Sequence, residues 1–256
     1  MLHYEIKGEG KPVIFLHGYL ENLKMWKGFA EELSRNYKII LIDLPGHGKS
    51  KSYHKTHTME FMAQKVNEVL EKLQIDKAIM VGHSMGGYVT LAFAGFFPEK
   101  LKAIVLQNSS SLPDLEEKKA QRLKAVETAH KNLDTLIKMS VPSLFAEKNL
   151  SDLKEEIEFA KGLARETSLE GVEAALRGMR ERPDRTKILD DFEGKIGIII
   201  GKYDKVVNPE ELKKIIPAKE NITVKELETG HMSHLEAPEE TLEFIRKLIT
   251  EVYGNK

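Results

Sequence analysis

The chain has 256 residues, of which 41% are hydrophobic and 31% charged, and its formal net charge is −1. This balance gives no broad basic surface, so we expect no nucleic-acid partner, and the absence of cysteine excludes disulfides, thiolate metal ligands and a thiol nucleophile. No apolar run approaches the ~20 residues of a membrane span, and the start lacks the pattern of a signal peptide. We therefore expect a cytoplasmic protein that does not contact a membrane.

Short runs rich in Ile and Val predict the strands of a parallel sheet. Most are apolar nearly throughout, as is typical where helices cover both faces of a sheet. The first residues differ, because Leu2, Tyr4 and Ile6 alternate with polar residues as in an edge strand. The predicted buried strands are residues 13–16, 39–42, 78–81, 103–106, 196–200 and 222–227.

Helical patterns lie between these runs, with apolar residues sharing one face at 26–33, 62–73 and 242–249. Asn208 is a predicted N-cap for a helix that begins at Pro209. Strands that alternate with helices predict an α/β fold with a doubly wound, mostly parallel sheet.

The alternation stops between about Ser109 and Pro183, where only helical patterns occur. Asp114 and Glu117 form a predicted capping box, followed by a charged helix that turns Leu123 and Val126 inward. We expect residues 1–108 and 187–256 to form the core domain, and residues 109–186 to form an all-helical cap inserted into it.

The strongest motif is Gly82-His83-Ser84-Met85-Gly86, a Gly-x-Ser-x-Gly sequence between a predicted strand and a predicted helix. A nucleophilic serine must project from a tight, strained turn there, and glycines remove the Cβ atoms that would clash. The helix that follows also directs free N–H groups toward a developing oxyanion. The alternative is a plain glycine-rich turn.

This motif, with four matching segments between His17 and about Glu239, resembles the α/β-hydrolase family in its cap-bearing branch of small esterases. The resemblance implies that the backbone N–H groups of Tyr19 and Met85 form the oxyanion hole. We interpret His17 as a structural histidine that hydrogen-bonds the loop, and a role in proton transfer is the alternative.

The segment from Asp43 to Ser50 resembles a turn of the same family, and we interpret it as loop architecture in which Asp43 bonds to backbone. A phosphate-binding loop is the alternative, but the spacing of its glycines does not match.

The resemblance places the catalytic base on His231, which follows Gly230 after the last predicted strand. His234 is the alternative base, and the His-x-x-His spacing could also indicate a metal pair, although no third ligand is apparent. The acid that orients the base matches Asp204, at the carboxyl end of a strand and thus at the same sheet edge as Ser84. A solvated Asp204 paired with Lys202 or Lys205 is the alternative.

The resemblance implies a two-step hydrolysis of a small carboxylic ester through an acyl-enzyme, with no cofactor and no metal. The same triad can serve a thioesterase, a lactonase, a carbon–carbon bond hydrolase or a cofactor-free haloperoxidase. A ligand-binding receptor with little turnover is the alternative outside enzymes. Trp26, Leu144 and Phe145 are candidate substrate-pocket residues, or else simply core residues.

Overall fold

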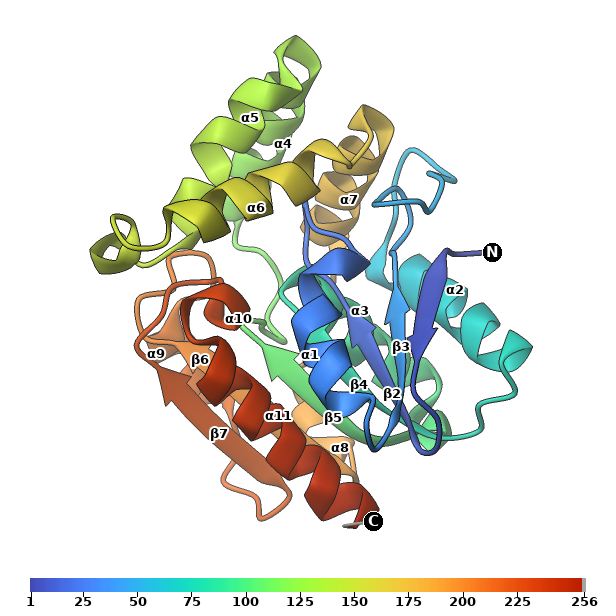
Figure 1. The fold of residues 1–256 in the computed structure, drawn as a ribbon. Coiled ribbons are helices and arrows are strands. Elements are labelled where there is room, and N and C mark those ends of the chain that lie inside the picture. The colour runs from blue at the N-terminus through green and yellow to red at the C-terminus, as the bar shows by residue number, and fades with distance from the viewer. Residues whose placement is uncertain (255–256) are drawn as a thin grey trace.

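The computed structural model describes residues 1–254, in which one seven-stranded sheet is covered by helices on both faces (Figure 1). The strand order is β1-β3-β2-β4-β5-β6-β7, with β1 antiparallel to β3 and every other pair parallel. The predicted α/β class and mostly parallel sheet are confirmed. The strands are β1 (Tyr4–Lys7), β2 (Pro12–Leu16), β3 (Lys38–Ile42), β4 (Ala78–His83), β5 (Leu101–Gln107), β6 (Lys195–Gly201) and β7 (Ile222–Leu227).

Alternate residues of each central strand enter two separate hydrophobic cores. In β2, Val13 and Phe15 pack toward α1 (Lys27–Leu33) and α11 (Pro238–Tyr253), whereas Ile14 and Leu16 pack toward α2 (Met59–Lys72) and α3 (Met85–Phe96). Both faces of the sheet are therefore buried, which explains why the predicted strands carry almost no polar residues.

The outer strand β7 departs from this prediction. Its four central residues are exposed, because β7 pairs only with β6 and forms one edge of the sheet. The connection from β6 runs through α9 (Pro209–Ile215), and Asn208 Oδ1 accepts hydrogen bonds from the N–H groups of Glu210 and Glu211, as the predicted cap requires.

Helices alone connect β5 to β6 within the described residues. Figure 1 shows α4 (Glu116–Lys131), α5 (Leu133–Ser140), α6 (Lys154–Arg165) and α7 (Leu169–Glu181) gathered at one end of the sheet, before α8 (Thr186–Asp191) returns the chain to it. The remaining helices are α10 (Ser233–Glu236) and the short 3₁₀ helices η1 (Leu23–Trp26), η2 (Pro98–Lys100), η3 (Pro142–Leu144) and η4 (Glu147–Asn149). No helix in residues 1–254 is long and apolar enough to cross a membrane.

The predicted capping box at the start of α4 is wrong. The N-cap residue is Leu115, with no side-chain cap, and the carboxylate of Asp114 instead forms ion pairs with Arg122 and Arg182. A buried carboxylate is stabilised more by guanidinium partners than by a backbone N–H group. Leu123, predicted to face inward, is 39% exposed.

Candidate active site

Ser84 lies in the tight turn that joins β4 to α3, as the motif predicts. Its backbone has φ 49° and ψ −114°, a left-handed φ that is strained for a serine. A Cβ atom on Gly82 would lie 2.3 Å from the carbonyl oxygen of Gly86, and one on Gly86 would lie 2.5 Å from that of Leu16. Only glycine fits at these two positions, so the motif is a packing requirement of the turn.

A continuous chain of hydrogen bonds joins Ser84, His231 and Asp204. The Nε2 atom of His231 lies 2.7 Å from Ser84 Oγ, and Nδ1 of the same ring lies 2.7 Å from Asp204 Oδ2. The aspartate accepts from Nδ1–H, which leaves Nε2 free to accept the serine proton. The three residues come from the ends of β4 and β6 and from the loop after β7, which meet at one edge of the sheet.

Asp204 is buried and held in its ionised form. Its Oδ1 accepts hydrogen bonds from the N–H groups of Val206 and Val207, at 2.7 and 2.9 Å. Burial opposes ionisation, but the charge and hydrogen bond of His231 together with these backbone donors lower the pKa of Asp204 below its ordinary value.

Asn108, which sequence reasoning missed, joins Asp204 to the loop that carries His231. Its Nδ2 donates to Asp204 Oδ2 at 3.2 Å and to the carbonyl of Gly230 at 3.0 Å, while its Oδ1 accepts from Ser233 Oγ at 2.6 Å. Asn108 follows β5 directly and has a positive φ of 46°. Asn108 could have been identified from the sequence as a polar residue that directly follows a buried strand and thus lies at the sheet edge that carries Ser84.

The loop after β2 lies against Ser84. A Cβ atom on Gly18 would lie 3.2 Å from Ser84 Cβ, which brings the backbone of Tyr19 close to the turn. On the other side of Ser84, α3 begins at Met85; the N–H groups of Gly87 and Tyr88 donate to the carbonyl of Ser84, whereas those of Met85 and Gly86 have no carbonyl partner within the helix. The predicted donors, Tyr19 and Met85, thus flank the serine.

Two neighbouring polar residues serve the architecture of these loops. His17 donates from Nδ1 to the carbonyl of Gly18 and accepts at Nε2 from the N–H of Leu44. Asp43 accepts from the N–H groups of Leu23 and Lys49, at 2.8 and 2.9 Å. Both therefore bind backbone, as their structural interpretations require.

A small cavity of about 80 Å³ opens onto Ser84 and His231. Its walls come from the loop after β2, the α3 turn and the helical segment that connects β5 to β6, including Leu144, one of the three predicted pocket residues. Phe145 and Trp26 do not line it. Trp26 is fully buried and packs against Phe15 and Phe29, so it belongs to the core. A larger groove of about 600 Å³ between α1 and α11 does not reach Ser84.

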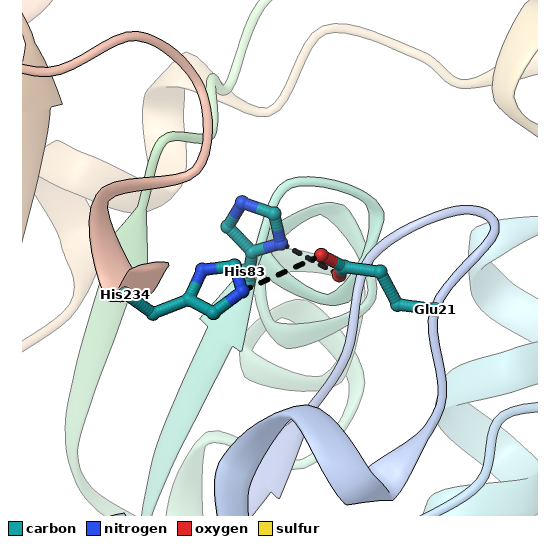
Figure 2. A group of neighbouring side chains, drawn as sticks. All are labelled: Glu21, His83 and His234. Atoms are coloured by element: carbon teal, nitrogen blue, oxygen red, sulfur yellow. Dashed lines mark hydrogen bonds and ion pairs between the residues drawn. The ribbon is translucent and has the colours of Figure 1, made fainter. Parts of the chain in front are cut away.

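Three further titratable residues, Glu21, His83 and His234, meet beside the Ser84 turn, and we call them the Glu21 cluster. Figure 2 shows the carboxylate of Glu21 directed at both histidines. The Nδ1 of His83 lies 2.8 Å from Glu21 Oε2, and Nε2 of His234 lies 3.7 Å from Glu21 Oε1. Glu21 also accepts the N–H of Gly18, at 2.6 Å, which links the cluster to the loop after β2.

His83 is positively charged in this arrangement. Its Nδ1 faces the Glu21 carboxylate, and its Nε2 lies 2.9 Å from the carbonyl oxygen of His231, so both nitrogens must donate. Burial lowers the pKa of His83, but the charge and hydrogen bond of Glu21 together raise it above its ordinary value. Burial likewise raises the pKa of Glu21, but the charge and hydrogen bond of His83, with smaller contributions from His234 and His17, lower it to about 2. A buried ion pair thus fixes the main chain of His231.

His234, the alternative base, lies within this cluster. Its Nδ1 accepts from Gln107 Nε2 at 3.3 Å, and its Nε2 faces Glu21. Burial and then the charge of His83 lower the pKa of His234 to about 3, so the ring is neutral. The predicted His-x-x-His metal pair does not form, because His231 binds Ser84 and Asp204 instead.

The ligand atoms of the Glu21 cluster lie within 4.8 Å of one another, a spacing compatible with a divalent cation. Glu21 Oε1 and His234 Nε2 have no hydrogen-bond partner within the described residues, but both nitrogens of His83 are used in hydrogen bonds. A cation bound by His83 Nδ1 would have to displace the proton that this atom shares with Glu21. The chemistry of the cluster therefore fits an ion pair better than a metal centre.

Comparisons with known proteins agree with this architecture. Residues 11–238 match the family model described as alpha/beta hydrolase fold. A thermophilic esterase from Thermogutta terrifontis is 30% identical with a TM-score of 0.93, covering 98% of this chain and 94% of that one. A 2-hydroxy-6-oxononadienedioate/2-hydroxy-6-oxononatrienedioate hydrolase from Pseudomonas putida is 28% identical over 80% of this chain and 76% of that protein. The acetyltransferase component of an acetoin cleaving system from Pseudomonas putida is 30% identical over 95% of this chain, which spans 66% of that protein.

Proposed function

Because the chain belongs to the α/β-hydrolase fold family, we propose that it is a serine esterase in which Ser84 is the nucleophile, His231 the base and Asp204 the orienting acid. The observation that carries the proposal is the unbroken hydrogen-bond chain, with 2.7 Å from Asp204 to His231 and 2.7 Å from His231 to Ser84. A plain glycine-rich turn has no need of a buried histidine and a buried carboxylate arranged in series.

In the first step, His231 Nε2 takes the proton of Ser84 as Oγ attacks the ester carbonyl. The backbone N–H groups of Tyr19 and Met85 stabilise the tetrahedral oxyanion, and each such donor is typically worth roughly 3 kcal/mol. Asp204 stabilises the imidazolium that forms. The alcohol then leaves with the proton from His231, and an acyl-enzyme remains on Ser84.

In the second step, His231 takes a proton from water, whose oxygen attacks the acyl carbonyl, and the acid leaves as Ser84 recovers its proton. The chemistry needs no cofactor. Residues 109–186 act as a cap on the core formed by 1–108 and 187–256, and this cap supplies Leu144 to the cavity. A cavity of about 80 Å³ favours esters with short chains.

The test is hydrolysis of p-nitrophenyl esters from acetyl to octanoyl by the wild type, Ser84→Ala and Ser143→Ala. Ser143 is an exposed cap serine that does not line the cavity, so it is a matched control. We expect turnover that is greatest for the short esters, falls by several orders of magnitude in Ser84→Ala and persists in Ser143→Ala.

Equal activity in the wild type and Ser84→Ala would contradict the assignment of the nucleophile. Tight binding of ester analogues without turnover would instead favour a ligand-binding receptor. Labelling of the wild type, but not of Ser84→Ala, by a fluorophosphonate would support an activated serine independently of substrate choice.

A further inference from the structure

One cap residue brings a buried positive charge to the catalytic cavity. Arg122 of α4 is 9% exposed and lines the cavity together with Ser84, His231 and Tyr19. The charged pair Glu21 and His83 also reaches this wall, but its two charges neutralise each other. Arg122 is paired with Asp114, which does not line the cavity, so the guanidinium is the charge that a bound substrate meets.

The charges around Arg122 leave an excess of positive charge. Asp114 is paired with both Arg122 and Arg182, so two buried guanidinium groups share one carboxylate. Arg182 is further held by stacking over the ring of Tyr88, 4.0 Å from its centroid, and by the carbonyls of Leu112 and Met179. Burial and then the charge of Arg122 lower the pKa of Lys118, one turn earlier on α4, as expected in a positive environment.

Two polar groups of these lining residues lack a strong acceptor. The Nη1 atom of Arg122 donates to the thioether sulfur of Met179 at 3.4 Å, and sulfur is a weak acceptor. The hydroxyl of Tyr19 is buried without a hydrogen-bond partner within the described residues. Tyr19 lies close enough to feel the charge of Arg122, although burial dominates and raises the pKa of its phenol. A buried cation and an unused hydroxyl donor are what a carboxylate accepts from.

We propose that the substrates are esters that carry a second, ionised carboxylate, and that Arg122 with the hydroxyl of Tyr19 holds this carboxylate while Ser84 attacks the ester carbonyl. The inference rests on the proposed esterase function and specifies its substrate class. The small cavity places the carboxylate a few bonds from the ester. Arg122 determines specificity here and takes no part in proton transfer.

The experiment compares kcat/KM for two matched pairs of esters. Monomethyl glutarate is compared with methyl pentanoate, in which a methyl group replaces an acyl-side carboxylate. Acetoxyacetate is compared with ethyl acetate, which makes the same replacement on the alcohol side. We expect the wild type to favour the anionic member of at least one pair by about ten- to hundredfold, as a charge-assisted hydrogen bond provides.

Three variants test whether Arg122 is the cause. Arg122→Gln lowers the anionic-to-neutral ratio toward one, Arg122→Lys retains part of it because the charge remains, and Tyr19→Phe lowers it by a smaller factor. Arg177→Gln is the matched control, because Arg177 is a cap arginine, 42% exposed and paired with Glu173, that does not line the cavity. The ratio is internal to each variant, so a partial loss of folded protein does not change it.

Two results would overturn the inference. If the wild type shows no preference for either anionic ester, or if Arg122→Gln keeps the wild-type ratio, then Arg122 only pairs with Asp114 to hold the cap. Ser84-dependent hydrolysis of the neutral esters would leave the proposed esterase function intact in that case. Absence of Ser84-dependent hydrolysis for all four esters would overturn both proposals.

Discussion

The buried ion pair behind the nucleophile gives a prediction that can be measured without any substrate. Glu21→Gln keeps the size of the side chain but removes the charge that balances His83. The amide oxygen of Gln can still accept from Gly18 and His83, but without the carboxylate the buried His83 must either keep an unpaired positive charge or lose a proton and with it one hydrogen bond. The variant should therefore be destabilised although no cavity is created.

The size of the effect follows from the pKa of Glu21. The fold lowers it from 4.5 to about 2, and at ~1.36 kcal/mol per pKa unit this is about 3 kcal/mol of stability. The side chain is only 4% exposed, so solvent screening does not reduce this value. The figure also agrees with the ~3–5 kcal/mol expected when one partner of a buried pair is removed.

The dependence on pH has two limbs. The depressed pKa of Glu21 stabilises the fold above 4.5, and this contribution is lost as the pH falls toward about 2. The raised pKa of His83 stabilises the fold below 6.5, and this contribution is lost as the pH rises through the folded-state value. The difference in free energy of unfolding between the wild type and Glu21→Gln should thus be largest between pH 4.5 and 6.5.

The assay is urea unfolding of both proteins at about pH 5.5 and at rising pH. Glu228→Gln is the control, because the pKa of Glu228 is also lowered to about 2, by Lys202 and Lys148, but this residue is fully exposed. Its unfolding midpoint should hardly change. A loss below about 1 kcal/mol in Glu21→Gln, or one that is constant with pH, would refute the reasoning.

Three further predictions concern the site and its turn. Asp204→Asn should lower kcat for ester hydrolysis by roughly 10³–10⁴ with little change in KM, because the tautomer of the base is lost; a small decrease would contradict the role of the acid. Gly82→Ala should lower the Tm sharply, since its Cβ would meet a backbone oxygen at 2.3 Å. Gly162→Ala in α6 has open space around its Cβ, so it should raise the free energy of unfolding by up to ~1 kcal/mol. Dialysis against EDTA should leave activity unchanged and release no stoichiometric metal from the Glu21 cluster, and a loss restored by zinc would identify a metal site.

Much of the fold could be predicted from the sequence because its signals are local. The Ile- and Val-rich runs mark buried strands wherever helices cover both faces of the sheet. The strand β7 was also predicted to be buried, but its central residues are exposed because β7 is an edge strand with one neighbour. The glycines around Ser84 are needed by the turn itself, so the turn could be located from the motif alone. That Asp204 and His231 lie near Ser84 could be predicted because both match segments of the family and follow strands that end at the same edge.

The contacts that hold this site together were decided by tertiary structure, because they join residues far apart in the chain. Asn108 reaches Asp204, and Glu21 reaches His83 and His234, across 62 or more positions of sequence. Asp114 matches a capping pattern in sequence, yet in the fold it meets two arginines, one of them 68 positions away. Trp26 could have been a pocket or a core residue until its neighbours Phe15 and His234 were known. Spacing along the chain carries the geometry of a turn or a helix face, but a buried charge takes whichever partner the packing of distant elements brings within reach.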